Sequence, residues 1–388
     1  MKKYLLLFTL LIVNISLSQS IRDSILPDIQ VNSAQRMLNN TDTKLTIGAY
    51  GEITYNQPES ENGELDIQRF ILMFGYKFSN KVQFISEIEI EHVKEVFVEQ
   101  AFVNYSVANN ISIRGGLMLV PMGIINEFHE PTTFNGVERP SLENKIIPST
   151  WREIGIGVNG RFPEISLSYQ AYIFNGFKST EADGEEIIGL LKGDNGLRGG
   201  RQKGIESTVS TPTFSGKIDY YGILGLRLGL AGYFGKTQAD DDIEDIKGAT
   251  VSIAMVGFDA RYKFQKFEAR GLFAYTSLSD TDAYNDLTGK DLGSALMGYY
   301  IEGGYNLLPL KAKQRLIAFT RFEQYYTHFK TDASTPKNKT YNRTDITMGL
   351  SYHIVNGVVI KGDYQIKDNA LSDAEVNNQL NFGVGVWF

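Results

Sequence analysis

The last ten residues of the 388-residue chain alternate between apolar side chains and polar or small ones. One parity holds Leu380, Phe382, Val384, Val386 and Phe388, and the other holds Gln379, Asn381, Gly383 and Gly385. Successive side chains of a β-strand point to opposite faces, so this segment predicts a strand with one apolar and one polar face. An outer-membrane β-barrel uses such strands, with the apolar face on lipid and the polar face on the lumen. A chain that stops on an aromatic residue in such a strand favours this arrangement.

The amino terminus predicts export. Lys2 and Lys3 precede an apolar run from Tyr4 to Leu17, and the small residues Ser16 and Ser18 suggest cleavage before Gln19. We therefore expect a secretory signal peptide over residues 1–18, with a short buried helix as the alternative. Residues 19–42 are polar and irregular and are expected to form a short periplasmic segment. Residues 43–388 are then the transmembrane barrel.

Composition narrows the function. The chain has no cysteine, which excludes disulfides, thiolate metal sites and a cysteine nucleophile. The net charge is −7, which makes nucleic acid an unlikely partner because phosphate binding needs a basic excess. Beyond the amino terminus no apolar run approaches the roughly 20 residues of a helical span, so only a closed barrel could cross a membrane.

Alternating runs continue from Lys44 to the end of the chain, and we count about 16 of them. Short connections are expected at 79–80, 108–110, 162–163, 222–225 and 356–357. Long connections are expected at 56–66, 120–151, 175–213, 236–249, 278–295, 329–342 and 368–378. Short turns at one end and long loops at the other are typical of outer-membrane barrels. The predicted fold class is thus all-β, a transmembrane antiparallel barrel of about 16 strands, with a soluble sandwich, β-helix or propeller as the alternative. Residues 94–107 mix charged and apolar side chains on both parities, and the sequence does not orient this strand.

The connection at 121–150 is the expected constriction loop. Four prolines stiffen it, and it carries more apolar residues than an exposed loop would. We expect it to fold against the inner wall of the barrel, with Glu127, His129, Glu138 and Arg139 beside the permeating solute. An ordinary packed cap loop is the alternative.

Basic residues recur on the parity that faces the lumen. A guanidinium is permanently charged and can bind a phosphate or carboxylate through two parallel hydrogen bonds. The candidate pore-lining, anion-contacting residues are Arg114, Arg139, Arg152, Arg227, Arg261, Arg270 and Arg321. Acidic residues on the same parity are about as numerous, so cross-strand ion pairs that stiffen the wall are the competing interpretation.

A row of acidic residues, Glu87, Glu89 and Glu91, could bind a divalent cation. Such a row is more often a solvated lumen face. We therefore expect no metal site and no cofactor.

Several stretches resemble porins of Bacteroidetes, which are grouped with the phosphate-selective porin (O/P) family. The principal stretches are 121–131, 134–140 and 151–157, and similar elements recur at 172–177, 199–204 and 232–237. The resemblance implies a 16-stranded, trimeric outer-membrane channel whose third loop constricts the pore. It also implies that arginines of the loop and wall attract anions. By position, Arg139 and Arg152 match the loop region, and Arg114 lies on the strand leading into it.

The expected function is a passive porin for small hydrophilic solutes, with a possible preference for anions such as phosphate. Its expected partners are outer-membrane lipid and small solutes. The main alternative is a non-conducting barrel with a structural or secretion-associated role, its lumen plugged by loops such as 175–213. An enzyme is a distant third, because the four histidines (His92, His129, His328 and His353) lie in no recognisable catalytic motif.

Overall fold

The computed structural model describes residues 32–39, 43–371 and 377–388. The predicted signal peptide lies outside these residues. Within them, no helix has the length and apolar character needed to cross a bilayer. The helical segments are α3 (Ser33–Asn39), α4 (Leu142–Lys145), α5 (Thr281–Thr288), η1 (Pro163–Ile165), η2 (Arg198–Gly200) and η3 (Lys339–Tyr341).

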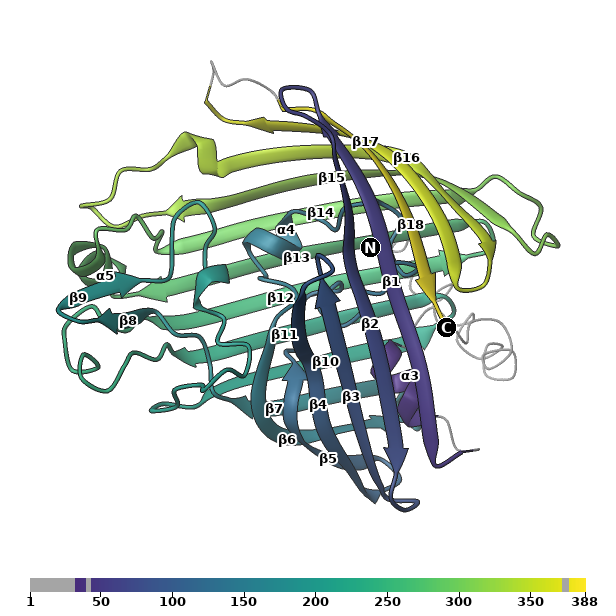
Figure 1. Cartoon of the computed structure of the whole chain (residues 1–388), viewed down its shortest axis with the longest axis horizontal. Helices are drawn as coiled ribbons and strands as arrows, with labels where there is room; N and C mark the ends of the chain where they lie inside the picture. Colours follow the sequence, from purple (N-terminus) through teal and green to yellow (C-terminus); the bar gives the residue numbers. More distant parts are fainter. Residues whose placement is uncertain (1–31, 40–42, 372–376) are drawn as a thin grey trace, which may run out of the picture.

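Sixteen antiparallel strands close into one barrel (Figure 1). They are β1 (Leu45–Pro58), β2 (Glu64–Lys77), β3 (Val82–Glu91), β4 (Glu95–Ala108), β5 (Ile111–Leu119), β6 (Arg152–Phe162), β7 (Leu167–Phe174), β10 (Thr213–Ile223), β11 (Leu226–Lys236), β12 (Ser252–Phe264), β13 (Phe267–Ser279), β14 (Ala295–Asn306), β15 (Arg315–Lys330), β16 (Asn342–Val355), β17 (Val358–Asn369) and β18 (Gln379–Trp387). Each strand pairs with its neighbours in the sequence, and β18 closes the barrel by pairing with β1. A separate hairpin, β8 (Thr180–Asp183) with β9 (Glu186–Gly189), lies in the connection between β7 and β10.

The alternation of the sequence becomes the two faces of the wall. In β18, Leu380, Phe382 and Val384 are 40–50% exposed on the outside, whereas Gln379 and Asn381 are buried on the inside. Many other strands carry the same outer row of exposed apolar side chains, such as Leu230 and Ile301. Apolar side chains that face outward from a closed barrel are solvated by lipid. The predicted all-β transmembrane barrel is confirmed.

A β-bulge explains why β4 could not be oriented from the sequence. The pairing of β3 with β4 shifts between Glu87 and Ile88, where Glu99 is the extra residue between Val98 and Gln100. A bulge reverses the parity of the strand beyond it, so a period of two fails across it. Both Glu99 and Gln100 are buried on the inner side as a result.

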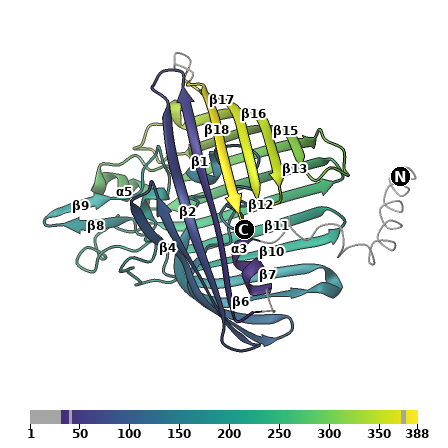
Figure 2. The ribbon, with the colours of Figure 1, turned by 45° about the vertical axis from the view of Figure 1, so that its right-hand side comes forward.

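Short turns and long loops lie at opposite ends of the barrel. The turns at 109–110, 224–225 and 356–357 are short, as predicted, and the loops at 120–151 and 175–212 are long. Figures 1 and 2 show α5 and the β8–β9 hairpin gathered at the long-loop end. One loop differs from the prediction, because β1 and β2 extend further and leave only residues 59–63 between them.

Helix α3 packs on the inner face of the barrel wall. Met37 and Ala34 are buried in one cluster with Ile71, Met73 and Ile85, which point inward from β2 and β3. The guanidinium of Arg36 lies 3.9 Å from the centre of the Trp387 ring. Within the predicted segment 19–42, Ser33–Asn39 therefore form a helix that packs on the inner wall of the barrel.

Candidate channel constriction

The connection between β5 and β6, residues 120–151, crosses the interior of the barrel. Most of it is buried, although it links two strand ends. Figure 1 shows its helix α4 in front of the rear strands β13 and β14. The predicted long loop in the lumen is confirmed, and we call residues 120–151 the constriction loop.

The apolar side of the loop packs on the inner wall. Ile124, Leu142 and Ile147 are at most 1% exposed and belong to one cluster with wall residues. At the end of the loop, the Trp151 ring lies 4.6 Å from the rings of both Phe177 and Tyr233. Burying each large apolar side chain is worth about 1.5–3 kcal/mol, and this burial holds the loop inside the barrel.

A buried carboxylate fixes the first bend of the loop. Glu143 Oε2 accepts hydrogen bonds from the backbone N–H groups of Ile124 (2.9 Å) and Ile125 (2.6 Å), and Oε1 accepts one from the Tyr300 hydroxyl (2.8 Å). Burial raises the pKa of Glu143 to about 7, although these three hydrogen bonds oppose the rise. The carboxyl thus joins two parts of the loop to β14.

The far part of the loop is bound by polar groups of the opposite wall. Asp363 accepts a hydrogen bond from the Val137 N–H (2.6 Å), and Lys361 Nζ donates one to the Gly136 carbonyl (2.8 Å). The Leu142 N–H donates to Glu323 (3.1 Å). Because these partners lie on β17 and β15, the loop reaches across the lumen to the far wall.

An open cavity lies on each side of the loop. The outer cavity, of about 1400 Å³, is lined by residues near the long-loop ends of the strands, such as Gln68 and Lys367, and by the loop residues Glu138 and Arg139. The inner cavity, of about 1110 Å³, is lined by residues near the short turns and by Glu127 of the loop. Helix α3 also borders the inner cavity. The loop therefore separates two polar vestibules.

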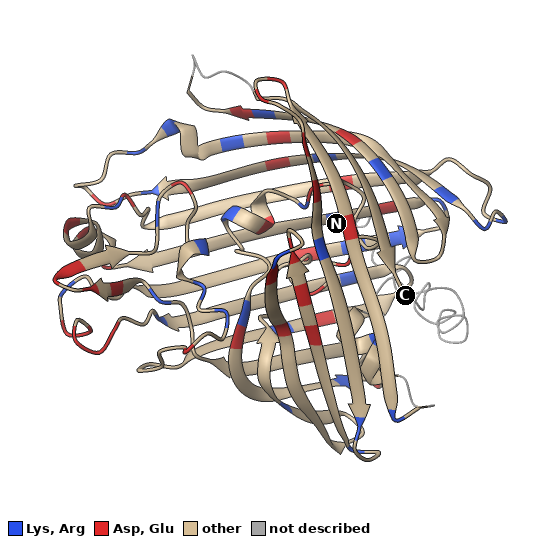
Figure 3. Ribbon diagram, in the orientation of Figure 1, with Lys and Arg blue, Asp and Glu red and all other residues tan. Residues whose placement is uncertain are grey.

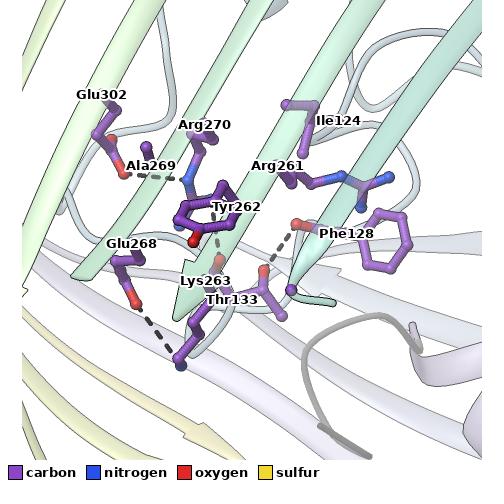
Figure 4. Close-up of a pocket in the computed structure, with 11 residues that line it drawn as sticks. Ile124, Phe128, Thr133, Arg261, Tyr262, Lys263, Glu268, Ala269, Arg270 and Glu302 are labelled. Carbon is purple, nitrogen blue, oxygen red and sulfur yellow. Dashed lines mark hydrogen bonds and ion pairs between the residues drawn. The ribbon is translucent and has the colours of Figure 1, made fainter. Parts of the chain in front are cut away.

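Arginines of the inner half are held in ion pairs. Arg227 Nη2 lies 2.9 Å from Asp219, and Arg261 lies 3.4 Å from Asp259. Arg270 Nε lies 3.1 Å from Glu302, and its Nη1 donates to the loop carbonyl of Thr133. Figure 4 shows Arg261 and Arg270 beside Phe128 and Thr133 of the loop. For these three arginines the structure agrees with the ion-pair interpretation.

The remaining wall candidates differ from one another. Arg321 is 1% exposed, bound by Glu323 (2.7 Å) and Glu302 (3.4 Å), and borders neither the outer nor the inner cavity. Arg114 lines the inner cavity, with its guanidinium 4.5 Å from the Phe102 ring centre. No carboxylate among the described residues lies within 4.0 Å of Arg114. Arg321 thus supports the loop, whereas Arg114 offers its charge to the cavity.

A second set of basic residues lies at and around the outer cavity. Arg139 and Arg198 line this cavity, whereas Arg152 and Arg201 do not. Arg139 lies 3.8 Å from Glu52, and Arg152 lies 3.9 Å from Glu89, so both pairs are loose. Arg198 and Arg201, from the connection between β7 and β10, join them. We call Arg139, Arg152, Arg198 and Arg201 the outer arginine cluster.

The two arginines of the β7–β10 connection have only backbone partners. Arg198 donates to the Ser149 carbonyl, and Arg201 Nη1 donates to the carbonyls of Thr150 (2.8 Å) and Pro148 (3.2 Å). Within the described ranges no carboxylate lies within 4.0 Å of either one. Burial and the nearby charges of Arg198 and Arg152 lower the pKa of Arg201 to about 9. Positive charge is therefore only partly compensated here.

Sequence reasoning missed Arg198 and Arg201, although the stretch 199–204 was part of the family resemblance. A Cβ at Gly199 would lie 2.1 Å from the Leu190 carbonyl oxygen, and one at Gly200 would lie 2.4 Å from that of Lys178. Only glycine permits this close approach. The glycine pair beside the arginines could have indicated a tightly packed segment of the long loop. It does not indicate which part of the barrel this segment contacts.

The four predicted constriction residues occupy different places. Glu127 and Glu138 border the inner and outer cavities, where they accept hydrogen bonds from Gln170 (2.7 Å) and Asn56 (2.8 Å). Arg139 also borders the outer cavity. His129 is fully buried beneath the loop and does not reach either vestibule.

Solved outer-membrane barrels share this architecture. The anion-selective porin from Comamonas acidovorans superposes with a TM-score of 0.59 at 12% identity, covering 89% of this chain and 99% of that chain. The outer membrane channel DcaP of Acinetobacter baumannii gives 0.59 at 11% identity, with coverages of 89% and 97%. OmpT, an outer membrane protein of Vibrio cholerae, gives 0.55 at 9% identity, also with 89% and 97%. At these identities the likeness concerns the fold.

The barrel resides in the outer membrane. Its backbone is closed on itself, and its outer face is a band of apolar side chains, which is the form in which a β-sheet crosses the outer membrane. The porin fold of the similar structures agrees with this location.

No protein-family model matches the chain. A protein of Aquifex aeolicus (strain VF5), described as an uncharacterized protein, is 33% identical over 349 residues. The match covers 84% of this chain and 76% of the relative. The chain therefore belongs to the same family as this Aquifex aeolicus protein, and it has the fold of the outer-membrane porins.

Proposed function

We propose that the protein is a passive outer-membrane channel for small hydrophilic solutes that prefers anions. A polar vestibule on each side of the constriction loop supports the channel part of this proposal. The wall around both vestibules is rich in hydrogen-bonding and charged groups, which can replace part of the hydration of a passing solute.

The outer arginine cluster carries the preference for anions. The outer cavity is lined by five basic side chains (Arg69, Arg139, Lys145, Arg198 and Lys367) and three acidic ones (Glu52, Glu91 and Glu138). Arg198 and Arg201 donate to carbonyl oxygens and keep their net charge, since no carboxylate neutralises them. A cluster of this kind attracts anions to the mouth of the constriction.

Phosphate is the proposed model solute. Guanidinium groups bind tetrahedral oxyanions through paired N–H donors, and several loosely bound arginines can pass an anion onward if each releases it readily. The resemblance to phosphate-selective porins of Bacteroidetes agrees with this choice. In the inner half, the ion pairs of Arg227, Arg261 and Arg270 leave less free charge, so selectivity arises at the outer cavity.

A planar-bilayer experiment tests the proposal. Under a salt gradient, we expect stable single channels with an anion-selective reversal potential and a block of the chloride current by phosphate. Arg198→Gln, at a residue that lines the outer cavity, should weaken the phosphate block by about tenfold, the equivalent of one charge-assisted hydrogen bond of roughly 1.5 kcal/mol. Lys311→Gln, in an exposed turn at the other end of the barrel, is the matched control and should leave the block unchanged.

Two results would contradict the proposal. Steady conductance without anion preference would mean that the charges of both vestibules are balanced by pairing. A folded barrel with no conductance would exclude the channel and favour a structural or secretion-associated role.

We further propose that three copies associate in the membrane. OmpT of Vibrio cholerae, which shares the fold, was solved in a trimer form, and this supports the proposal. Light scattering of the detergent-solubilised protein, corrected for bound detergent, should give three times the mass of one chain. A mass of one chain at all concentrations would contradict the trimer.

A further inference from the structure

The bulge in β4 creates a group of buried metal-binding side chains beneath the constriction loop. Glu87 of β3, Glu99 of β4 and His129 of the loop each offer one ligand atom, and these atoms lie within 4.8 Å of one another. All three residues are fully buried. Figure 3 shows acidic residues gathered along the middle of β3 and β4. The sequence suggested a row of Glu87, Glu89 and Glu91, but the structure groups Glu87 with two residues from other elements.

We propose that Glu87, Glu99 and His129 bind one divalent transition-metal cation of the zinc class, which fastens the constriction loop to the barrel wall.

The tautomer of His129 suits a metal ligand. Its Nδ1 lies 3.1 Å from the carbonyl oxygen of Asn126, and only a protonated Nδ1 can make that hydrogen bond. In the neutral ring, Nε2 then keeps its lone pair and faces Glu99, 3.4 Å away. Histidines that bind metals usually donate their other N–H to a carbonyl or carboxylate in this way.

The two carboxylates lack enough partners. Glu87 Oε2 and Glu99 Oε1 are buried oxygens without a hydrogen-bond donor. The nearby Arg69 is engaged by Glu52 at 2.6 Å, and its Nη2 donates a hydrogen bond to the His129 carbonyl. A buried carboxylate without compensation is costly, and a divalent cation would balance the charge of both.

The remaining oxygens are already oriented by hydroxyl donors. Ser33 of α3 donates to Glu87 Oε1 at 2.8 Å, and Tyr50 of β1 lies 3.0 Å from Glu99 Oε2. The Tyr50 hydroxyl also lies 2.7 Å from His129 Nε2. If a metal bound that nitrogen, the Tyr50 hydroxyl would donate its hydrogen bond to Glu99 instead. These contacts form an outer shell that fixes the ligands.

The ligand set selects the class of metal. One imidazole with two carboxylates suits zinc and its neighbours, whereas calcium and magnesium prefer oxygen ligands only. Ligand atoms around a tetrahedral zinc ion lie about 3.4 Å apart, given bonds of roughly 2.0–2.1 Å. The side chains would therefore need to draw together by about 1 Å, which rotation about their side-chain bonds can provide.

Metal binding can be measured on the folded barrel independently of conductance. After treatment with a chelator and dialysis, titration calorimetry with ZnCl₂ should show one equivalent bound per chain. His129→Gln and Glu99→Gln should each weaken zinc binding by more than tenfold. His353→Ala, a buried histidine on β16 outside the group, is the matched control and should bind zinc as the unmodified protein does.

The shift in electrophoretic mobility on heating verifies that each variant is folded. Copper-loaded protein gives a second measurement, because one imidazole nitrogen should appear in its electron paramagnetic resonance spectrum and vanish in His129→Gln. Absence of stoichiometric zinc binding, or zinc binding unchanged in a folded double variant of His129 and Glu99, would overturn the proposal. Binding of calcium or magnesium but not zinc would overturn the assigned class.

Discussion

A buried arginine in this barrel is neutralised or keeps its net charge according to its partners. Arg321 and Arg201 are both largely enclosed, yet Arg321 is bound by two carboxylates and Arg201 by backbone carbonyls. The carboxylates neutralise the charge of Arg321, whereas no carboxylate of the described residues lies within 4.0 Å of Arg201. The two residues should therefore respond differently to substitution.

Arg321→Met should destabilise the barrel by about 3–5 kcal/mol, because it leaves Glu323 buried without a cation and Glu302 with Arg270 alone. Urea unfolding in lipid vesicles measures this change in the free energy of unfolding. The exposed Lys311→Gln serves as control and should stay within about 0.5 kcal/mol of the unmodified protein. An equally small effect of Arg321→Met would contradict the structural role.

Glu143 should make stability depend on pH. Its pKa in the folded protein is raised from 4.5 to about 7, so the folded state holds the proton more tightly than the unfolded state. Stability from this group is greatest below about pH 4.5 and falls as the pH rises to about 7, by on the order of 3 kcal/mol. Thermal unfolding at pH 5 and pH 8 should show this fall, and Glu143→Gln should reduce it. An unchanged pH dependence in the variant would assign it to other groups.

At the scale of elements, three segments reshape a lumen that the strands alone would leave wide. The constriction loop crosses it, the β7–β10 connection brings arginines above it, and α3 lines its inner half. A barrel of sixteen strands is wide enough to leave an open lumen, so these segments set the width of that lumen.

Removal of residues 19–42 should increase the single-channel conductance. Ala34, Gln35 and Leu38 of α3 border the inner cavity, and their loss would widen it. Conductance in planar bilayers provides the measurement, with residues 1–18 retained in the shortened protein. Met37→Ser, which weakens packing of α3 on Ile71 and Met73, should shift conductance in the same direction but less. Equal conductance of the full-length and shortened proteins would show that α3 does not limit the current.

At the scale of the whole molecule, the outer apolar band fixes the barrel in lipid. Leu230, near the middle of β11, is 60% exposed, and Phe264, at the end of β12, is 45% exposed. Residues of similar exposure thus lie at different depths along the wall.

Leu230→Arg should destabilise the barrel folded in vesicles by about 2–4 kcal/mol, whereas Phe264→Arg should destabilise it by about 0–1 kcal/mol. The reason is that a charge at mid-depth loses its hydration, while one near the strand end reaches the interface. Equilibrium refolding from urea into vesicles measures both. Equal costs would show that the strands cross the membrane in another register than the exposed band indicates.

The sequence by itself determined the barrel and the lumen-facing parity of its regular strands, but not that of β4, which contains a bulge. Alternation with a period of two is a local property of each strand. The faces of residues such as Leu380 and Gln379 can therefore be predicted without knowing which strands lie beside them. The length and proline content of 121–150 likewise predicted a loop inside the barrel.

Only the tertiary structure decided which side chains meet. The bulge at Glu99, the burial of His129 and the docking of Arg198 and Arg201 on the constriction loop all join segments that are far apart in the chain. Likewise, only the structure shows that Arg321 is bound in ion pairs whereas Arg114 packs on an aromatic ring, although both residues face the lumen. Such contacts exist only once the barrel has closed, because closure sets the distance between strands that no local pattern records.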